Sequence, residues 1–81
     1  MARKKNEMKA KEPVKLRFKK LSNANQSIYL DIYYKGKRYY EFLKLYLTPE
    51  RFPEDRDKNR ITLRLANSIK AQRIIDLQNE I

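Results

Sequence analysis

Apolar and polar side chains alternate most clearly over residues 26–44, QSIYLDIYYKGKRYYEFLK. In the first half of this stretch, Ile28, Leu30 and Ile32 fall on one side of an extended chain, because side chains alternate along a strand with a period of two. Gly36, the only glycine of the protein, lies in the middle, where a tight turn needs a residue that tolerates positive φ. The pattern predicts a β-hairpin with one apolar face.

The length of the hairpin loop decides which side chains of the second strand join that apolar face. A two-residue loop at Lys35-Gly36 pairs Ile32 with Tyr39 and Leu30 with Glu41. A three-residue loop over residues 34–36, with a glycine bulge, places a different set there: Arg38, Tyr40 and Phe42. We predict the three-residue loop, because it keeps the Glu41 carboxylate off the apolar face, where an unpaired charge is costly. Lys-Gly is also a poorer type I′ pair than Asn-Gly.

A second alternating stretch, VKLRFKKL over residues 14–21, precedes the hairpin and is connected to it by the polar turn SNAN. We therefore expect a three-stranded antiparallel meander. The predicted inner face carries Val14, Leu16, Phe18, Ile28, Leu30, Ile32, Tyr40 and Phe42. The predicted outer face carries Lys15, Arg17, Lys19, Tyr29, Asp31, Tyr33, Lys37, Tyr39 and Glu41. Asp31 and Glu41 are expected to hold neighbouring cations such as Arg17 across the strands.

The pattern changes after Pro53, where Asp55 and Asp57 suit the N-terminus of a helix because carboxylates complement the helix dipole. One stripe at helical spacing is expected to cover the inner face of the sheet: Ile61, Leu65, Ile69, Gln72 and Ile75. A second stripe lies roughly opposite and is expected to meet something outside this chain: Leu63, Ala66, Ile74, Leu77 and Ile81. The fold class is therefore α+β, a three-stranded antiparallel sheet packed against one C-terminal helix.

Charge separates the N-terminus from the rest of the chain. The net charge is +10, and residues 1–20 alone hold nine basic and two acidic side chains. Residues 1–13 have almost no large apolar side chains, so we expect a disordered basic tail before a single domain over residues 14–81. Nucleic acid is favoured over a membrane as partner, because no basic amphipathic helix with bulky aromatic residues appears. No secretory signal is recognisable, and we expect a cytoplasmic location.

Residues typical of catalysis and metal binding are lacking. The chain has no cysteine and no histidine, so thiolate ligands, disulfides, imidazole ligands and the usual general base are excluded. No glycine-rich phosphate loop or metal-ligand spacing is present. We interpret Asp55 and Asp57 as a helix cap rather than a catalytic pair, and expect a non-catalytic domain without cofactor, metal or small-molecule substrate.

The predicted outer face offers binding chemistry. Lysine and arginine neutralise phosphates, arginine also binds guanine edges, and a sheet fits the major groove of a DNA duplex. Cross-strand tyrosine pairs on a solvated face are the simpler interpretation. The adjacent cationic strand favours a nucleic-acid-binding face.

The run VKLRFKKLSNANQSIYLDIYYKGKRYYEFLKLYLTPER, followed by LANSIKAQRIIDLQ, resembles the N-terminal arm-type DNA-binding domain of tyrosine-recombinase integrases. It is most similar to those of Bacteroides-type conjugative transposons and prophages, from Val14 to the C-terminus, and the YKGKRYY turn is its most specific part. The resemblance implies sequence-selective binding of double-stranded DNA at arm-type sites during recombination and DNA integration. It also implies a larger parent protein, whose core-binding and catalytic domains hold the recombinase residues; none of those residues maps to this chain.

The resemblance further implies which residues contact DNA. By position, the expected contacts are Lys15, Arg17, Lys19, Tyr29, Tyr33, Lys37 and Tyr39 on the sheet, with Lys35 and Arg38 near phosphates at the turn. Arg3, Lys4 and Lys5 of the tail are candidates for contacts in the minor groove of DNA. The protein is expected to associate with the bacterial nucleoid. Two alternatives stay open: a double-stranded RNA or ribosomal-type binding module, and a protein-interaction module working through the helix.

Overall fold

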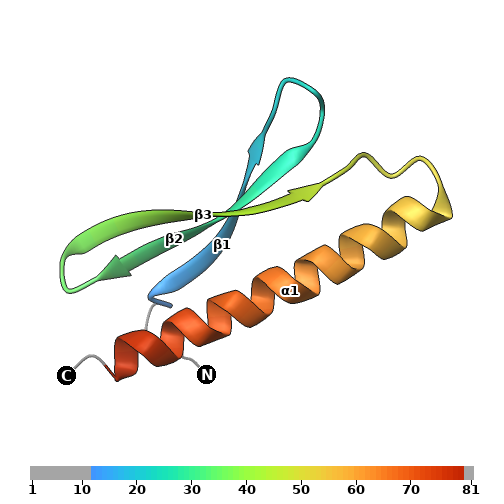
Figure 1. Ribbon diagram of the computed structural model, residues 1–81. Coiled ribbons are helices and arrows are strands. Elements are labelled where there is room, and N and C mark those ends of the chain that lie inside the picture. Colours follow the sequence, from blue (N-terminus) through green and yellow to red (C-terminus); the bar gives the residue numbers. More distant parts are fainter. Residues whose placement is uncertain (1–11, 80–81) are drawn as a thin grey trace, which may run out of the picture.

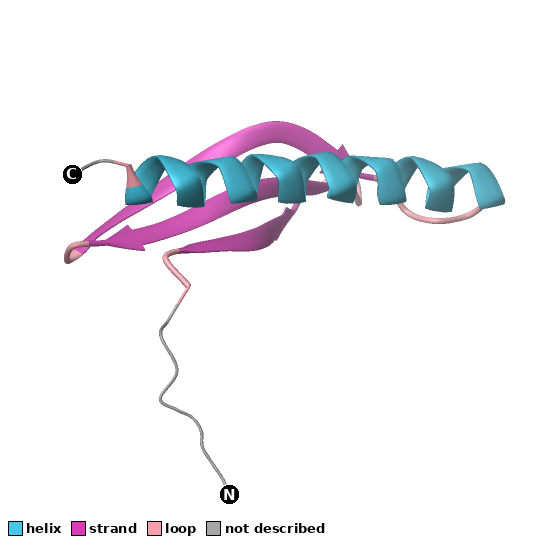
Figure 2. Ribbon diagram, turned by 90° about the horizontal axis from the view of Figure 1, so that it is seen from below, coloured by secondary structure: helices cyan, strands magenta, loops and turns pink. Residues whose placement is uncertain are grey.

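The computed structural model describes residues 12–79 and contains three strands followed by one helix (Figure 1). The elements are β1 (Val14–Lys20), β2 (Gln26–Tyr34), β3 (Lys37–Leu47) and α1 (Pro53–Gln78). The strands form one antiparallel sheet in the order β1-β2-β3, and α1 lies across one face of it (Figure 2). The predicted α+β class is confirmed. The expected tail, with Arg3, Lys4 and Lys5, lies outside the described residues except for Glu12 and Pro13, as does Ile81.

The first hairpin joins β1 to β2 as the alternation predicted. Its register places Leu16 opposite Leu30 and Arg17 opposite Tyr29, so apolar residues share one face and polar residues the other. The backbone N–H of Leu21 donates to the carbonyl of Asn25 at 2.8 Å and closes the SNAN turn. Both faces of β1 are therefore as the sequence predicted.

The second hairpin has the shorter of the two possible loops, so the predicted three-residue loop is wrong. Tyr34 pairs with Lys37, leaving a two-residue turn in which Lys35 has φ 52° and Gly36 has φ 77°. Two positive φ values are typical of a type I′ turn, whose twist matches that of the strands it joins. Lys35 therefore adopts a conformation usually taken by asparagine or glycine.

This register places Glu41 opposite Leu30, on the face covered by the helix. The expected cost of an unpaired carboxylate does not arise, because both oxygens of Glu41 accept hydrogen bonds from the Arg73 side chain of α1. Arg73 is 32 residues away in the sequence, so the local pattern of the hairpin gave no sign of it.

The faces of β3 are consequently exchanged relative to the prediction. Three residues that the predicted loop placed on the apolar face lie on the outer face instead: Arg38, Tyr40 and Phe42. Tyr40 and Phe42 are 57% and 51% exposed. Three residues expected on the outer face lie on the helix side instead: Lys37, Tyr39 and Glu41.

A β-bulge in β3 separates this part of the hairpin from the far end of the strand. Phe42 pairs with Tyr29 and Leu45 with Ile28, so two residues of β3 lie between adjacent residues of β2. One of them, Lys44, has φ 59°, while Leu43 packs against the core. Bulges increase local strand twist, and this one leaves Phe42 outside and Leu43 inside.

The core lies between the sheet and α1. Val14, Leu30 and Ile32 form its buried cluster, and the partly buried residues packed against it are Leu16, Leu43, Ile69, Ile74 and Leu77. From the helix, the second predicted stripe faces the sheet, with Ala66 fully buried. Most of the stripe expected to cover the sheet is exposed: Ile61 at 64%, Leu65 at 50% and Ile75 at 47%. The two stripes were therefore assigned to the wrong sides, with Ile69 the exception.

Polar contacts attach α1 near its two ends, to the residue that follows β3 and to the last residue of β2. The side-chain oxygen of Asn59 accepts from the backbone N–H of Thr48 at 3.0 Å, and its Nδ2 donates to the carbonyl of Thr48 at 2.8 Å. Near the other end, the Tyr34 hydroxyl donates to the carbonyl of Leu77 at 3.3 Å. Asp55 accepts hydrogen bonds from the backbone N–H groups of Arg51 and Phe52, as its predicted capping role requires. Asp57, predicted with it, lies 3.7 Å from Arg60 instead. These contacts set which side of the helix meets the sheet.

Candidate nucleic-acid interface

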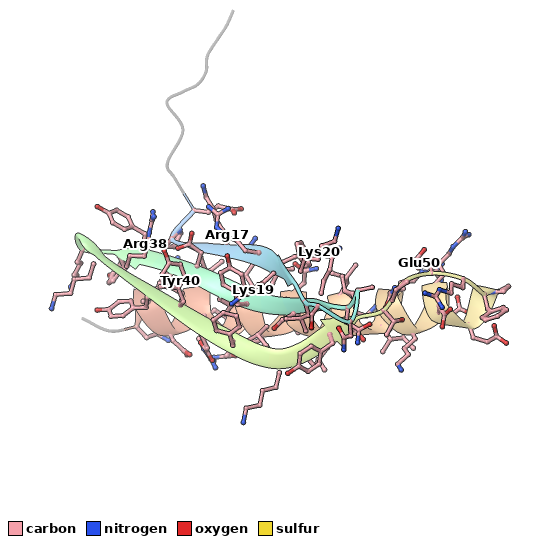
Figure 3. The ribbon with its side chains drawn as sticks, turned by 90° about the horizontal axis from the view of Figure 1, so that it is seen from above. Arg17, Lys19, Lys20, Arg38, Tyr40 and Glu50 are labelled. Atoms are coloured by element: carbon pink, nitrogen blue, oxygen red, sulfur yellow. The ribbon has the colours of Figure 1, made fainter. Side chains whose placement is uncertain are left out.

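The face of the sheet opposite α1 is not covered by the helix and gathers charged and aromatic side chains. Figure 3 views this outer face and shows Arg17, Lys19, Arg38 and Tyr40 above the three strands, with the helix behind. Glu50 lies away from them, beside the N-terminal part of α1 (Figure 3). We define the outer face by nine residues, three from each strand: Lys15, Arg17, Lys19, Tyr29, Asp31, Tyr33, Arg38, Tyr40 and Phe42.

Aromatic rings occupy the centre of the outer face. The rings of Tyr29 and Phe42 stack with their centroids 4.8 Å apart, and Tyr40 meets Tyr29 edge-on at 6.0 Å. The Arg38 guanidinium lies over the Tyr33 ring, 5.2 Å from its centroid. Such contacts hold large side chains in place although they are exposed. The outer face is therefore an ordered platform with apolar rings beside cations.

Asp31 connects the two arginines of this face. Its carboxylate accepts a hydrogen bond from Nε of Arg17 at 2.6 Å, and its other oxygen lies 3.4 Å from Nε of Arg38. The Asp31 side chain is only 6% exposed, whereas those of Arg17 and Arg38 are 46% and 53% exposed. The hydrogen bond from Arg17 to Asp31, together with the negative charge of Asp31, raises the pKa of Arg17. The prediction that Asp31 holds Arg17 across the strands is confirmed.

A shallow hollow of about 980 Å³ opens beside this ion pair. Lys15 and Arg17 line it from β1, Lys35 and Arg38 line it from the second hairpin, and Asp31 lies between them. Glu12 also lines the hollow, so four cations surround two carboxylates. The net positive charge gives the hollow a field that attracts an anion such as a phosphate.

Glu41 plays a different part from the one predicted. Nε and Nη2 of Arg73 donate to its two oxygens at 2.8 and 2.7 Å, on the helix side of the sheet. The hydrogen bonds from Arg73 lower the pKa of Glu41, and those to Glu41 raise the pKa of Arg73. This pair joins β3 to α1 and is a structural contact.

The structure brings together six of the nine residues predicted to contact DNA: Lys15, Arg17, Lys19, Tyr29, Tyr33 and Arg38. Lys35 lies in the turn at the edge of the hollow, while Lys37 and Tyr39 belong to the opposite side of the sheet. Tyr40 and Phe42 were missed, although the two-residue loop, had it been chosen, places both on the outer face. Contact of each residue with DNA stays a prediction.

The sequence signature of one protein family, described as the arm DNA-binding domain, matches residues 14–81 and so spans the sheet and the helix. The chain belongs to this family. It is accordingly a DNA-binding domain with double-stranded DNA as its partner, and the RNA-binding alternative has no comparable support. No curated protein and no solved structure matches the chain. Within residues 12–79, no helix is long and apolar enough to span a membrane.

Proposed function

We propose that this arm DNA-binding domain reads arm-type sites for a tyrosine recombinase, binding duplex DNA sequence-selectively during site-specific recombination and DNA integration. Membership of the family supports DNA binding, and the resemblance of residues 14–81 to integrase domains supports the recombinase context. The parent belongs to a mobile element such as a prophage or conjugative transposon, and its catalytic residues lie in other domains. The domain works on nucleoid DNA in the bacterial cytoplasm.

The proposed docking places the outer face in the major groove. One observation carries this proposal: Arg17, Arg38 and the exposed rings of Tyr40 and Phe42 share the face that α1 leaves uncovered. A two- or three-stranded ribbon fits the major groove, where arginine binds guanine edges and apolar rings contact thymine methyl groups. The central position of these side chains therefore suits base reading.

Lysines at the margins of the outer face are suited to phosphates. Lys15 and Lys19 lie on the edge strand β1, and Lys35 lies in the turn beside the hollow. Phosphate contacts release counterions, so affinity is expected to fall steeply as salt concentration rises. The proposed contact set is therefore the outer face and Lys35, without Lys37 and Tyr39.

An NMR titration of the labelled domain tests this docking. The probes are a duplex selected by the protein from a random library and a scrambled duplex of equal length, each at two salt concentrations. We expect the selected duplex to shift the amide signals of Arg17, Tyr29 and Tyr40 more strongly than the scrambled one, with α1 signals at Ile61 and Leu65 unchanged. Equal weak shifts confined to residues 1–13, or shifts centred on α1, would contradict the proposal.

A second candidate function, contact with another protein or domain, is favoured by the exposed aliphatic stripe of α1. Ile61, Leu65 and Ile75 together present a row of apolar side chains away from the sheet. The core-binding and catalytic domains of the proposed parent are the partners that fit this function. If it holds, Leu65→Gln weakens association with those domains in a binding assay while leaving duplex affinity unchanged. Equal association of Leu65→Gln and the wild-type protein would count against it.

A further inference from the structure

Arg17 and Arg38 turn the same part of their side chains toward Asp31. In both, Nε is the nitrogen that faces the carboxylate, at 2.6 Å for Arg17 and 3.4 Å for Arg38. Within residues 12–79, the terminal nitrogens of both guanidinium groups have no hydrogen-bond acceptor. Arg17 is thus hydrogen-bonded at its inner nitrogen, whereas Arg38 is held beside Asp31 by charge and by the Tyr33 ring, without a hydrogen bond to the carboxylate. Both arginines keep their outer edges for another acceptor.

The edge left open is the one that recognises guanine. Two terminal N–H groups of one guanidinium match the O6 and N7 acceptors that guanine presents in the major groove. An exposed arginine without a partner samples many rotamers and loses that freedom on binding. An arginine already fixed by a buried carboxylate loses less, so its contact contributes more to affinity and to selectivity.

We propose that Asp31 is a positioning residue that holds Arg17 and Arg38 as a pair of guanine-reading side chains. Asp31 lies on the central strand β2, between Lys15 on β1 and Tyr40 on β3, so one carboxylate serves arginines from both flanking strands. This inference rests on the proposed docking of the outer face. It assigns the acidic residue of that face a role in specificity, although its charge opposes that of DNA.

Simple electrostatics predicts the opposite effect of removing Asp31. If the carboxylate contributes only negative charge, Asp31→Asn strengthens binding to every duplex, because the domain becomes more positive. Glu41→Gln is a matched control, since it makes the same change of charge on the helix side of the same sheet, where the carboxylate holds Arg73. The sign of the effect therefore separates positioning from charge.

The experiment measures the affinity of the wild-type protein, Asp31→Asn and Glu41→Gln for a duplex selected by the wild type from a random library and for a scrambled duplex. We expect Asp31→Asn to lose about tenfold or more in affinity for the selected duplex, the order of one bidentate arginine–guanine contact. Its affinity for the scrambled duplex is expected to stay equal or to rise slightly. Glu41→Gln is expected to keep the wild-type preference.

Two further probes guard against loss of fold in Asp31→Asn. Arg17→Lys and Arg38→Lys keep the positive charge at exposed positions but remove the planar guanidinium with its two terminal N–H groups. Each variant is expected to bind the selected duplex less preferentially over the scrambled one, with an amide NMR spectrum that shows the fold is retained. Replacing the guanines of the selected duplex by 7-deazaguanine removes N7 and is expected to weaken wild-type binding more than that of the two lysine variants.

The outcomes distinguish this inference from the proposed function. Equal or tighter binding of Asp31→Asn to the selected duplex, with wild-type preference, would overturn the positioning role and leave the arm-site function standing. Retained preference in both lysine variants would do the same. A wild-type protein that selects no sequence would overturn the proposed function, and the inference with it.

Discussion

The two faces of the sheet each carry a carboxylate paired with arginine, and the pairs differ in what they leave available. On the helix side, Nε and Nη2 of Arg73 donate hydrogen bonds to Glu41, and Nη1 of Arg73 lies 3.6 Å from the Asp76 carboxylate. On the outer face, Arg17 donates a hydrogen bond to Asp31 through Nε alone. Arg73 is therefore fully occupied in joining strand to helix, whereas Arg17 is fixed and still able to bind. The same pair of residue types serves structure on one face and, in the proposed docking, recognition on the other.

Burial differs between the faces in the same sense. The helix side holds the fully buried Val14 and Leu30, while the outer face exposes about half of Tyr40 and Phe42. Apolar burial stabilises a fold in proportion to the area removed from water. Changes on the helix side are therefore expected to act on stability, and changes on the outer face on binding.

The largest expected effect on stability comes from truncating a side chain in the core. Leu30→Ala removes a fully buried side chain from the core cluster and is expected to lower the free energy of unfolding by about 2–5 kcal/mol. Tyr40→Ala, on the outer face, is expected to cost less than about 1 kcal/mol. Denaturant unfolding of both variants measures the difference; a Tyr40→Ala loss as large as that of Leu30→Ala would mean the faces are misassigned.

The arginines of the two pairs are expected to separate binding from stability. Arg17→Ala should weaken binding to a selected duplex by about tenfold or more, with the domain still folded because Asp31 keeps Arg38 nearby. Arg73→Ala should leave duplex affinity within about twofold and lower stability by about 1 kcal/mol. Duplex titration and denaturant unfolding of each variant check the pair. Loss of binding in Arg73→Ala with stability unchanged would reverse the comparison.

Lowering the pH is expected to remove the stability that the Glu41–Arg73 ion pair contributes. Because Arg73 lowers the pKa of Glu41, the folded state binds its proton less readily than the unfolded state. The contribution of the Glu41–Arg73 pair to stability is fully present above the ordinary glutamate pKa of about 4.3. It is lost as the pH falls through the lowered pKa of Glu41 in the folded state. Wild type is therefore expected to be more stable than Glu41→Gln by about 1 kcal/mol at pH 7, with the gap closing in acid. Unfolding curves over pH measure this, and a gap that widens in acid would contradict it.

The smallest expected effect compares two exposed strand lysines. Lys19 lies on the outer face, whereas Lys37 lies on the helix side of β3. Lys19→Ala is expected to reduce the slope of log affinity against log salt by about one, the loss of one phosphate contact, and Lys37→Ala to leave it unchanged. Equal reductions in both variants would show that Lys37 also reaches the backbone of the duplex.

Local patterns predicted the elements but not all of the faces. The alternation over residues 14–20 and 26–34, with Gly36 and SNAN as turns, was sufficient for a three-stranded meander and for both faces of β1. The face of β3 depended on whether Glu41 had a partner, and that partner lies on a helix 32 residues away. A contact between distant segments carries no signal in the strand itself. Six residues of β3 were therefore placed on the wrong sides: Lys37, Arg38, Tyr39, Tyr40, Glu41 and Phe42.

The helix shows the same limit. Its existence followed from the spacing of apolar residues and from Asp55 at its start, but two apolar stripes competed for the sheet. The two hydrogen bonds between the Asn59 side chain and the Thr48 backbone fix the rotation of α1 relative to the preceding loop. With this rotation, Ala66 rather than Leu65 faces the core. The burial of Asn59, which requires a polar partner, is known only from the structure, so the sequence alone could not select the stripe that faces the sheet.

The two attachments of α1, Asn59 to Thr48 and Tyr34 to Leu77, have a mechanical consequence. They attach a 26-residue helix, about 39 Å long at 1.5 Å per residue, to the end of β2 and to the residue after β3, so we expect the sheet and the helix to turn together. In the proposed docking, the angle at which the sheet sits in the groove would therefore set the direction of the helix axis. A tilt of about ten degrees at one end swings the other by about 7 Å over that length. In the proposed docking, a small difference in how a DNA site seats the strands would therefore move the far end of the helix by several ångströms.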